Sequence, residues 1–182
     1  MRQTESECRM NRYQRCASIG AAVIACAAFT GASVDPAPAG PANKETPTVT
    51  RLKASGAFEV KLLPVGEAEK GEGSTLARMT IDKQFHGELE ATSKGQMLTA
   101  MTETKGSAGY VAIERVTGNL AGKKGSFVLQ HNATMDRGTP MLNIIVVPDS
   151  GTGELTGLTG TMKINVAGGK HSYEFDWAIP AK

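Results

Sequence analysis

Cysteine is missing from the part of the chain that could fold as a domain. The three cysteines, Cys8, Cys16 and Cys26, all lie within the first 26 residues, and none follows. A domain that begins after them can form no disulfide, and it offers no thiolate as a nucleophile or metal ligand. Any chemistry must therefore come from other side chains.

A net charge is also missing after the N-terminal segment. From Val34 to the C-terminus, sixteen Lys and Arg residues balance sixteen Asp and Glu residues. No basic stripe is present that could follow the phosphate backbone of DNA or RNA. The composition argues against nucleic acid as a partner.

The N-terminal segment has an apolar run that is too short and too rich in alanine to span a membrane. Arg9, Arg12 and Arg15 precede the run ASIGAAVIACAAFTGAS. A basic segment followed by a short apolar run is typical of a secretory signal peptide. We predict that residues 1–33 are this signal, and that the protein is periplasmic or secreted.

Cys26 leaves a second outcome of export open. It ends the tetrapeptide VIAC, which resembles a loose bacterial lipobox. In that case Cys26 would carry lipid and anchor the protein to the envelope, which is the one membrane contact that the sequence suggests. The alternative is an ordinary cysteine within the apolar run, since short motifs match by chance.

The segment after the signal differs in composition from the rest of the chain. Residues 34–50 contain four prolines and almost nothing that could be buried. Such a composition is typical of an extended linker. We predict a tether over residues 34–54 and a single domain over residues 55–180.

The domain has no stretch with a sustained helical period. Runs rich in Val, Ile, Thr and Phe alternate instead with Gly-containing turns at intervals of about 8–12 residues, which is typical of a β-barrel or β-sandwich. The predicted strands are FEVKLL, ARMTIDKQF, GELEATS, QMLTAMTET, YVAIERVTG, GSFVLQHNATM, MLNIIVV, TGTMKINV and HSYEFDWAI.

Two glycines near the C-terminus allow a test of strand register. Gly168–Gly169 suits a two-residue hairpin turn, which needs positive φ. This turn places Ile164 opposite Tyr173 on an apolar face. The other face then pairs Lys163 with Glu174, as on a solvated sheet surface.

The same reasoning applies to a second hairpin, within GSAGYVAIERVTGNLAGKKGSFVLQH. A turn at Gly122–Lys123, with glycine first as in a type II′ turn, places Glu114 directly opposite His131. Tyr110 then lies opposite Met135 on the same face. Because this face carries the larger side chains, we predict that it faces inward and that Glu114 and His131 form a hydrogen bond there.

Together with VVPDSGTGELTGLTG and HSYEFDW, this stretch resembles a bacterial family, the Domain of Unknown Function 3224 family. The resemblance extends from about Phe58 to Trp177. It implies an all-β fold, a closed antiparallel barrel of about eight strands similar to allene oxide cyclase and to other calycin-like barrels. No activity is established for the family, so the resemblance implies no catalytic residue, and the likeness to the cyclase concerns the fold alone.

The interior of such a barrel is either filled by side chains or holds one small ligand. In the first interpretation of the inward pair, Glu114 orients the His131 imidazole to move protons at an enolisable or epoxide-like ligand. In the second, the two buried groups only satisfy each other.

The candidate ligand-binding residues share the predicted inward face. They are Tyr110, Glu114, Phe127, Leu129, His131 and Met135. The domain is also rich in methionine, whose thioether adapts either to an irregular ligand or to an irregular core. The methionines in question are Met97, Met101, Met135, Met141 and Met162.

No metal or cofactor site is predicted. His86, His131 and His171 are isolated in the sequence and lack the short spacing of zinc ligands. The Gly-rich stretch SGTGELTGLTG is not followed by the Lys-Ser/Thr pair or the helix of a phosphate-binding loop.

Three functions remain open at this point. The first is an exported barrel that binds a small, mostly apolar molecule. The second is a cofactor-free isomerase or cyclase that uses Glu114 and His131. The third is a filled barrel of the envelope whose outer face contacts a partner.

Overall fold

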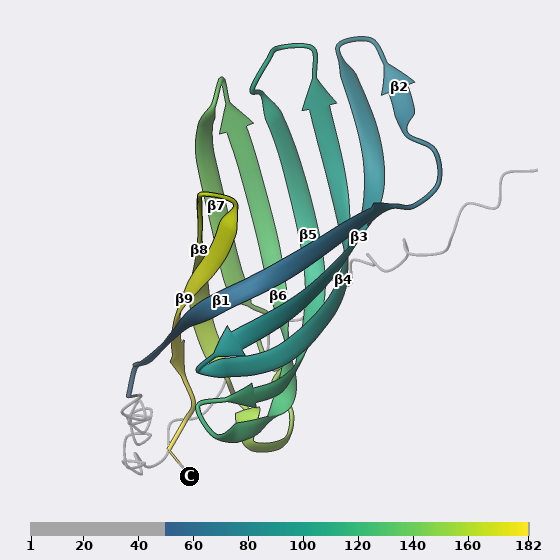
Figure 1. Cartoon of the computed structure of the whole chain (residues 1–182). Coiled ribbons are helices and arrows are strands. Elements are labelled where there is room, and N and C mark those ends of the chain that lie inside the picture. The colour runs from purple at the N-terminus through teal and green to yellow at the C-terminus, as the bar shows by residue number, and fades with distance from the viewer. Residues whose placement is uncertain (1–49, 182) are drawn as a thin grey trace, which may run out of the picture. The chain divides into compact units, whose positions relative to one another are not determined.

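A computed structural model describes residues 50–181, which form nine antiparallel strands and one turn of 3-10 helix, η1 (Gly153–Leu155) (Figure 1). The predicted signal, the Cys26 motif and most of the predicted tether lie outside the described residues. The strands are β1 (Leu52–Pro64), β2 (Glu69–Gly71), β3 (Ser74–Gly87), β4 (Leu89–Thr102), β5 (Ala108–Leu120), β6 (Lys123–Asp136), β7 (Thr139–Val146), β8 (Thr159–Ala167) and β9 (Lys170–Ala178). No helix of this region is long and apolar enough to cross a bilayer.

Eight of the strands close into a barrel. They follow the order β1-β9-β8-β7-β6-β5-β4-β3, and a second pairing of β1 with β3 completes the ring. The closed antiparallel barrel predicted from the sequence is therefore confirmed. β1 begins at Leu52, so residues 52–54, which we had placed in the tether, belong to the first strand.

The strands differ in length, and the barrel closes only over part of the long ones. β3, β4 and β6 have 14 residues each, whereas β8 and β9 have nine. β1 pairs with β3 only from Met79 to Gly87, and β2 pairs with the first residues of β3. In Figure 1 the long strands consequently continue past β1 as an open sheet. This part, called the extension below, comprises residues 74–78, 98–102, 108–111, 132–136 and 139–143.

The closed part of the barrel has a continuous apolar core. Inward-facing side chains recur at every second residue of each strand, as β-geometry requires. Large aromatic rings meet at the centre, where Phe58 lies 5.5 Å from Phe85 and Phe127 stacks on Phe175 at 5.7 Å. Gly56 lets β1 cross β3 closely, because a Cβ at this position would lie 1.9 Å from the His86 carbonyl oxygen.

The two hairpins used for register prediction gave different outcomes. Ile164 pairs with Tyr173 and Lys163 with Glu174, so the predicted β8–β9 register is confirmed. The predicted turn at Gly122–Lys123 is wrong.

Ala121 and Gly122 form the β5–β6 turn instead, with φ values of 48° and 86°. Positive φ at both central residues is typical of a type I′ turn, and an alanine seldom adopts it. The pairing consequently moves by two residues, so that Glu114 lies opposite Leu129 and His131 opposite Ala112. A shift of two residues preserves the face of every side chain.

Candidate functional site

Four polar side chains are buried together on the inner face of the barrel. Lys83 on β3, Ser93 on β4, Glu114 on β5 and His131 on β6 are at most 6% exposed, and Glu114 is completely buried. Lys83 and Ser93 are directly opposed, and Glu114 and His131 lie on the neighbouring inward positions. We call these four residues the Glu114 cluster.

The Glu114 carboxylate is the centre of this cluster. Its Oε1 accepts hydrogen bonds from Lys83 Nζ at 2.6 Å and His131 Nε2 at 2.8 Å, and its Oε2 accepts one from Ser93 Oγ at 2.6 Å. An ionised carboxylate can only accept, so the imidazole carries a proton on Nε2.

The predicted inward, hydrogen-bonded pair of Glu114 and His131 is confirmed, although the direct opposition of the two residues is wrong. The bond joins diagonal neighbours, which are within reach of long side chains. Lys83 and Ser93 were not predicted from the sequence. Both follow the inward alternation of their strands, Ile81-Lys83-Phe85 and Ala91-Ser93, and this period-two pattern could have identified them.

Opposing effects act on the pKa of Glu114. Burial raises it, but the hydrogen bond from His131 and the positive charge of Lys83 outweigh burial and lower the pKa from 4.5 to about 2. Glu114 is therefore ionised at neutral pH, and Lys83 supplies the compensating charge. The Lys83 ammonium also lies 5.2 Å from the Phe58 ring centroid and 5.6 Å from that of Phe85, within cation–π distance.

The cluster is internally satisfied. Among the described residues, the only fully buried side-chain nitrogen or oxygen without a partner is Trp177 Nε1, which lies elsewhere in the core. A general base works best when its pKa is near the working pH. A carboxylate with three donors and a pKa of about 2 suits a structural ion pair better than proton abstraction.

The structure separates the other candidate ligand-binding residues into two groups. Phe127 and Leu129 are at most 1% exposed and pack in the main core. Tyr110 and Met135 lie in the extension, where Tyr110 is half-buried and Met135 is 42% exposed. A ligand could therefore reach Tyr110 and Met135 without disturbing the core.

Tyr110 borders a second, smaller apolar cluster. Ile81, Met97 and Ala112 form it, and Met79 and Tyr110 pack against it. Burial and the negative charge of Glu114 both raise the pKa of Tyr110, so its phenol keeps its proton at neutral pH. The phenol can act there as a hydrogen-bond donor to a bound molecule.

Beyond this cluster, apolar side chains on the inner face remain exposed. Alternation from the buried residues of each strand directs Leu62, Met101, Met135, Leu142 and Val166 inward, yet they are 38–59% exposed. The methionines are divided in the same way: Met97 and Met162 are buried, whereas Met101, Met135 and Met141 are not. The expectation of a Met-rich interior holds for two of the five.

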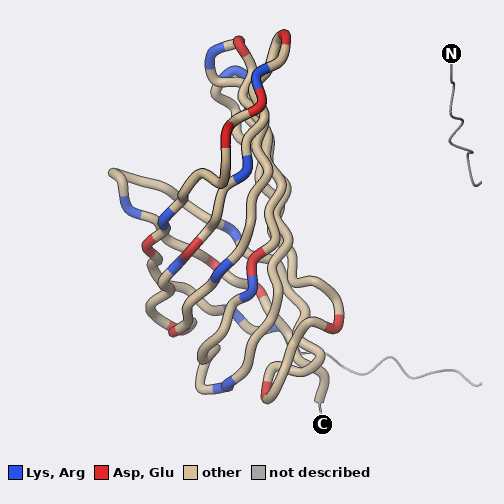
Figure 2. The backbone as a smooth tube through the Cα atoms, turned by 90° about the vertical axis from the view of Figure 1, so that its right-hand side faces the viewer, with Lys and Arg blue, Asp and Glu red and all other residues tan. Residues whose placement is uncertain are grey.

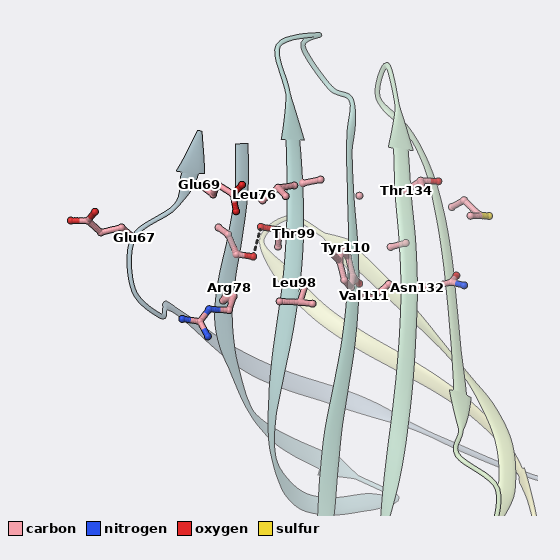
Figure 3. Close-up of a pocket in the computed structure, with 15 residues that line it drawn as sticks. Glu67, Glu69, Leu76, Arg78, Leu98, Thr99, Tyr110, Val111, Asn132 and Thr134 are labelled. Atoms are coloured by element: carbon pink, nitrogen blue, oxygen red, sulfur yellow. Dashed lines mark hydrogen bonds between the residues drawn. The ribbon is translucent and has the colours of Figure 1, made fainter. Parts of the chain in front are cut away.

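The outer face of the extension is also hollowed. Two open hollows of about 680 Å³ each meet at Leu98 and Val111, which line both. Figure 3 shows Leu76, Leu98, Val111 and Asn132 following one another across β3, β4, β5 and β6. Most of the lining residues alternate with the inward ones and so lie on the outer surface of the sheet, although the inward positions Thr99 and Tyr110 also line the first hollow.

The histidines form no metal centre. His86 contacts Glu59 at 3.0 Å on the surface, and the His171 ring lies 5.1 Å from the Phe58 ring. Within residues 50–181, no three His, Cys, Asp or Glu side chains converge as metal ligands would.

Comparison with known proteins agrees with this fold. The family model described as "Protein of unknown function (DUF3224)" matches residues 54–177. The chain belongs to the DUF3224 family. The crystal structure of a DUF3224 family protein of unknown function from Shewanella oneidensis MR-1 is similar, with a TM-score of 0.67 and 52% sequence identity. The match covers 74% of this chain and all of that one. No curated protein is significantly similar to the chain.

Proposed function

We propose that this DUF3224 protein binds a small, mostly apolar molecule at the open end of its barrel. The observation that supports this proposal is the set of inward-facing apolar side chains that stay exposed in the extension, around the half-buried phenol of Tyr110. Binding sites for small molecules are typically apolar walls with a few polar groups that orient the ligand. Met97, Met101 and Met135 supply adaptable contacts, and Tyr110 supplies the polar one.

The Glu114 cluster lies next to this site but does not enter it. It separates the main core, which contains Phe127 and Leu129, from the smaller cluster around Met97. We propose that it acts as a rigid polar layer below the ligand. The low pKa of Glu114 makes it a poor base, which argues against an isomerase or cyclase that would use Glu114 in this role. A binding function needs no such base.

A matched pair of methionine substitutions tests the location of the site. Met135 and Met141 lie on β6 and β7 and are similarly exposed, but alternation directs Met135 to the inner face and Met141 to the outer face. We expect Met135→Glu to reduce binding at least about tenfold, because it places a charge against an apolar ligand. Met141→Glu should leave binding unchanged.

Native mass spectrometry of the protein, purified without denaturation from the cells that produce it, provides the readout. A small molecule carried by the wild type and by Met141→Glu, but lost from Met135→Glu, is the expected result. Loss of the small molecule from Met141→Glu alone would indicate that it binds on the outer face instead. The absence of a bound molecule, together with no affinity for apolar fluorescent probes, would contradict the proposal.

We also propose that the protein acts outside the cytoplasm, with residues 1–33 as its export signal. The intact mass of the mature chain tests this. An unmodified start near Ser33 would indicate a soluble periplasmic or secreted form, and a diacylglyceryl group on Cys26 would indicate an envelope lipoprotein. An unprocessed chain that starts at Met1 or Met10 would contradict export.

A further inference from the structure

The outer face of the extension carries several exposed apolar side chains. Leu76, Leu98, Val111 and Met141, together with the neighbouring Ile113, are 46–56% exposed there. We call these five residues the outer strip. Leu76, Leu98 and Val111 lie on the neighbouring strands β3, β4 and β5, where Leu98 pairs with Val111 and Leu76 pairs with Ala100. Met141 lies on β7, beyond the polar outer residues Asn132 and Thr134 of β6. Exposed apolar surfaces of this extent usually mark an interaction site.

The extension lacks a second layer on this side. A β-sheet with an apolar face is stable when another sheet or helix packs against that face. No strand or helix among residues 50–181 covers the outer strip, whose side chains line the two open hollows instead. An occupant from outside this part of the chain would supply the missing layer.

The charges around the outer strip identify the kind of occupant. At the β2 end, Glu67, Glu69 and Arg78 border the first hollow, which leaves one net negative charge. At the other end, Lys94 and Arg115 border the second hollow.

Asp82 pairs with Lys94 at this second end, which leaves one net positive charge. In Figure 2 the charged residues gather at the turns and on the closed part of the barrel, and the long strands between them carry few. The outer face therefore has an acidic end at Glu67 and Glu69 and a basic end at Lys94 and Arg115. Between them lie the apolar side chains of the outer strip and Arg78, which pairs with Leu98.

This pattern is complementary to itself. A two-fold axis that lies in the contact plane and crosses the strands at right angles would place the acidic end of one chain over the basic end of the other. The same rotation would place the two outer strips against each other, about 10 Å apart as in packed sheets. An isologous contact of this kind uses one surface twice.

We infer that the outer strip is the contact surface between two copies of this chain, which form a two-fold symmetric dimer. The acidic end of each copy, which contains Glu69, lies over the basic end of the other, which contains Lys94 and Arg115, and Val111 lies near the centre of the contact. The inner face and its proposed ligand site stay open in this arrangement, since the copies meet through their outer faces.

Sedimentation of the full chain, measured over a range of concentrations, tests the inference. The wild type should have twice the mass of one chain. Val111→Lys should raise the dimer dissociation constant by about 100-fold or more, because it places a charge at the centre of an apolar contact. Thr117→Lys is the matched control: it adds the same charge at an exposed outer position of β5 outside the strip, and it should remain dimeric.

Charge reversal tests the orientation independently and does not depend on the folding of Val111→Lys. Glu69→Lys and Lys94→Glu should each weaken the dimer about tenfold, and the double variant should recover the wild-type constant. A monomeric wild type, or a dimer that survives Val111→Lys, would overturn the inference. A monomer whose outer strip binds a lipid or another small molecule, which Val111→Lys releases, would also overturn the inference.

Discussion

The closed part of the barrel and the extension are built from the same strands but differ in what they bury. In the closed part, inward side chains such as Phe85, Val116 and Leu129 are completely buried. In the extension, the same alternation continues to Met101 and Met135, which are 59% and 42% exposed. The closed part therefore buries its inward apolar side chains, whereas the extension leaves apolar side chains exposed, and both proposals depend on this exposed surface.

The Glu114 cluster lies near the boundary between the two regions. Lys83, Ser93 and His131 all donate hydrogen bonds to the buried Glu114 carboxylate, so its charge is compensated within the protein. Substitutions in the closed part or in the Glu114 cluster should therefore change stability, whereas substitutions in the extension should change ligand binding.

Removal of Lys83 should have the largest effect. Lys83→Met leaves the buried Glu114 carboxylate without its counter-charge, and we expect a loss of about 3–5 kcal/mol in the free energy of unfolding. Denaturant titration measures this loss. The control is the double variant Lys83→Met/Glu114→Leu, which removes both charges and should be clearly more stable than the single variant. A single variant within about 1 kcal/mol of wild type would show that the pair is not the buried centre described above.

Truncation of one inward side chain in each region compares the regions directly. Leu129→Ala removes a completely buried side chain and should cost about 2–5 kcal/mol. Met101→Ala removes an exposed one and should cost less than about 0.5 kcal/mol. Thermal or denaturant unfolding of the two variants measures the difference. Equal losses would mean that the extension is packed as tightly as the barrel core.

Acid should destabilise the closed part in a defined window. The folded pKa of Glu114 is about 2, below its ordinary value of 4.5. The stability from this shift, about 3 kcal/mol, is therefore present above pH 5 and is lost as the pH falls toward 2. Unfolding measured at pH 7, 5, 4 and 3 should show the decline, and the double variant Lys83→Met/Glu114→Leu should lack this part of it. An identical decline in both proteins would assign the acid sensitivity to other groups.

The sequence predicted more of the closed part than of the extension, for a physical reason. The β8–β9 register followed from Gly168–Gly169 and from alternation, both of which are local. The prediction of the β5–β6 turn was wrong because Ala121 adopts a positive φ that alanine normally avoids.

Alternation was sufficient to place Glu114 and His131 inside even though the turn was wrong. It could also have identified Lys83 and Ser93, whose partners are distant in sequence but inward on their own strands. Alternation cannot predict whether another layer of the protein covers a residue. It assigns Met101 to the inner face and Val111 to the outer face, but whether a second layer covers either residue depends on how far β1, β8 and β9 extend.

One paired measurement distinguishes a structural Glu114 cluster from a ligand site on the inner face of the extension. Stability and ligand affinity should be measured together for Glu114→Gln and Met135→Glu. Glu114→Gln should lower stability while the folded protein keeps its affinity for the ligand, and Met135→Glu should lower affinity while stability is unchanged. The reverse pattern, with affinity lost in a stable Glu114→Gln protein and kept in Met135→Glu, would contradict this expectation. It would indicate that the Glu114 and His131 pair contributes directly to the function.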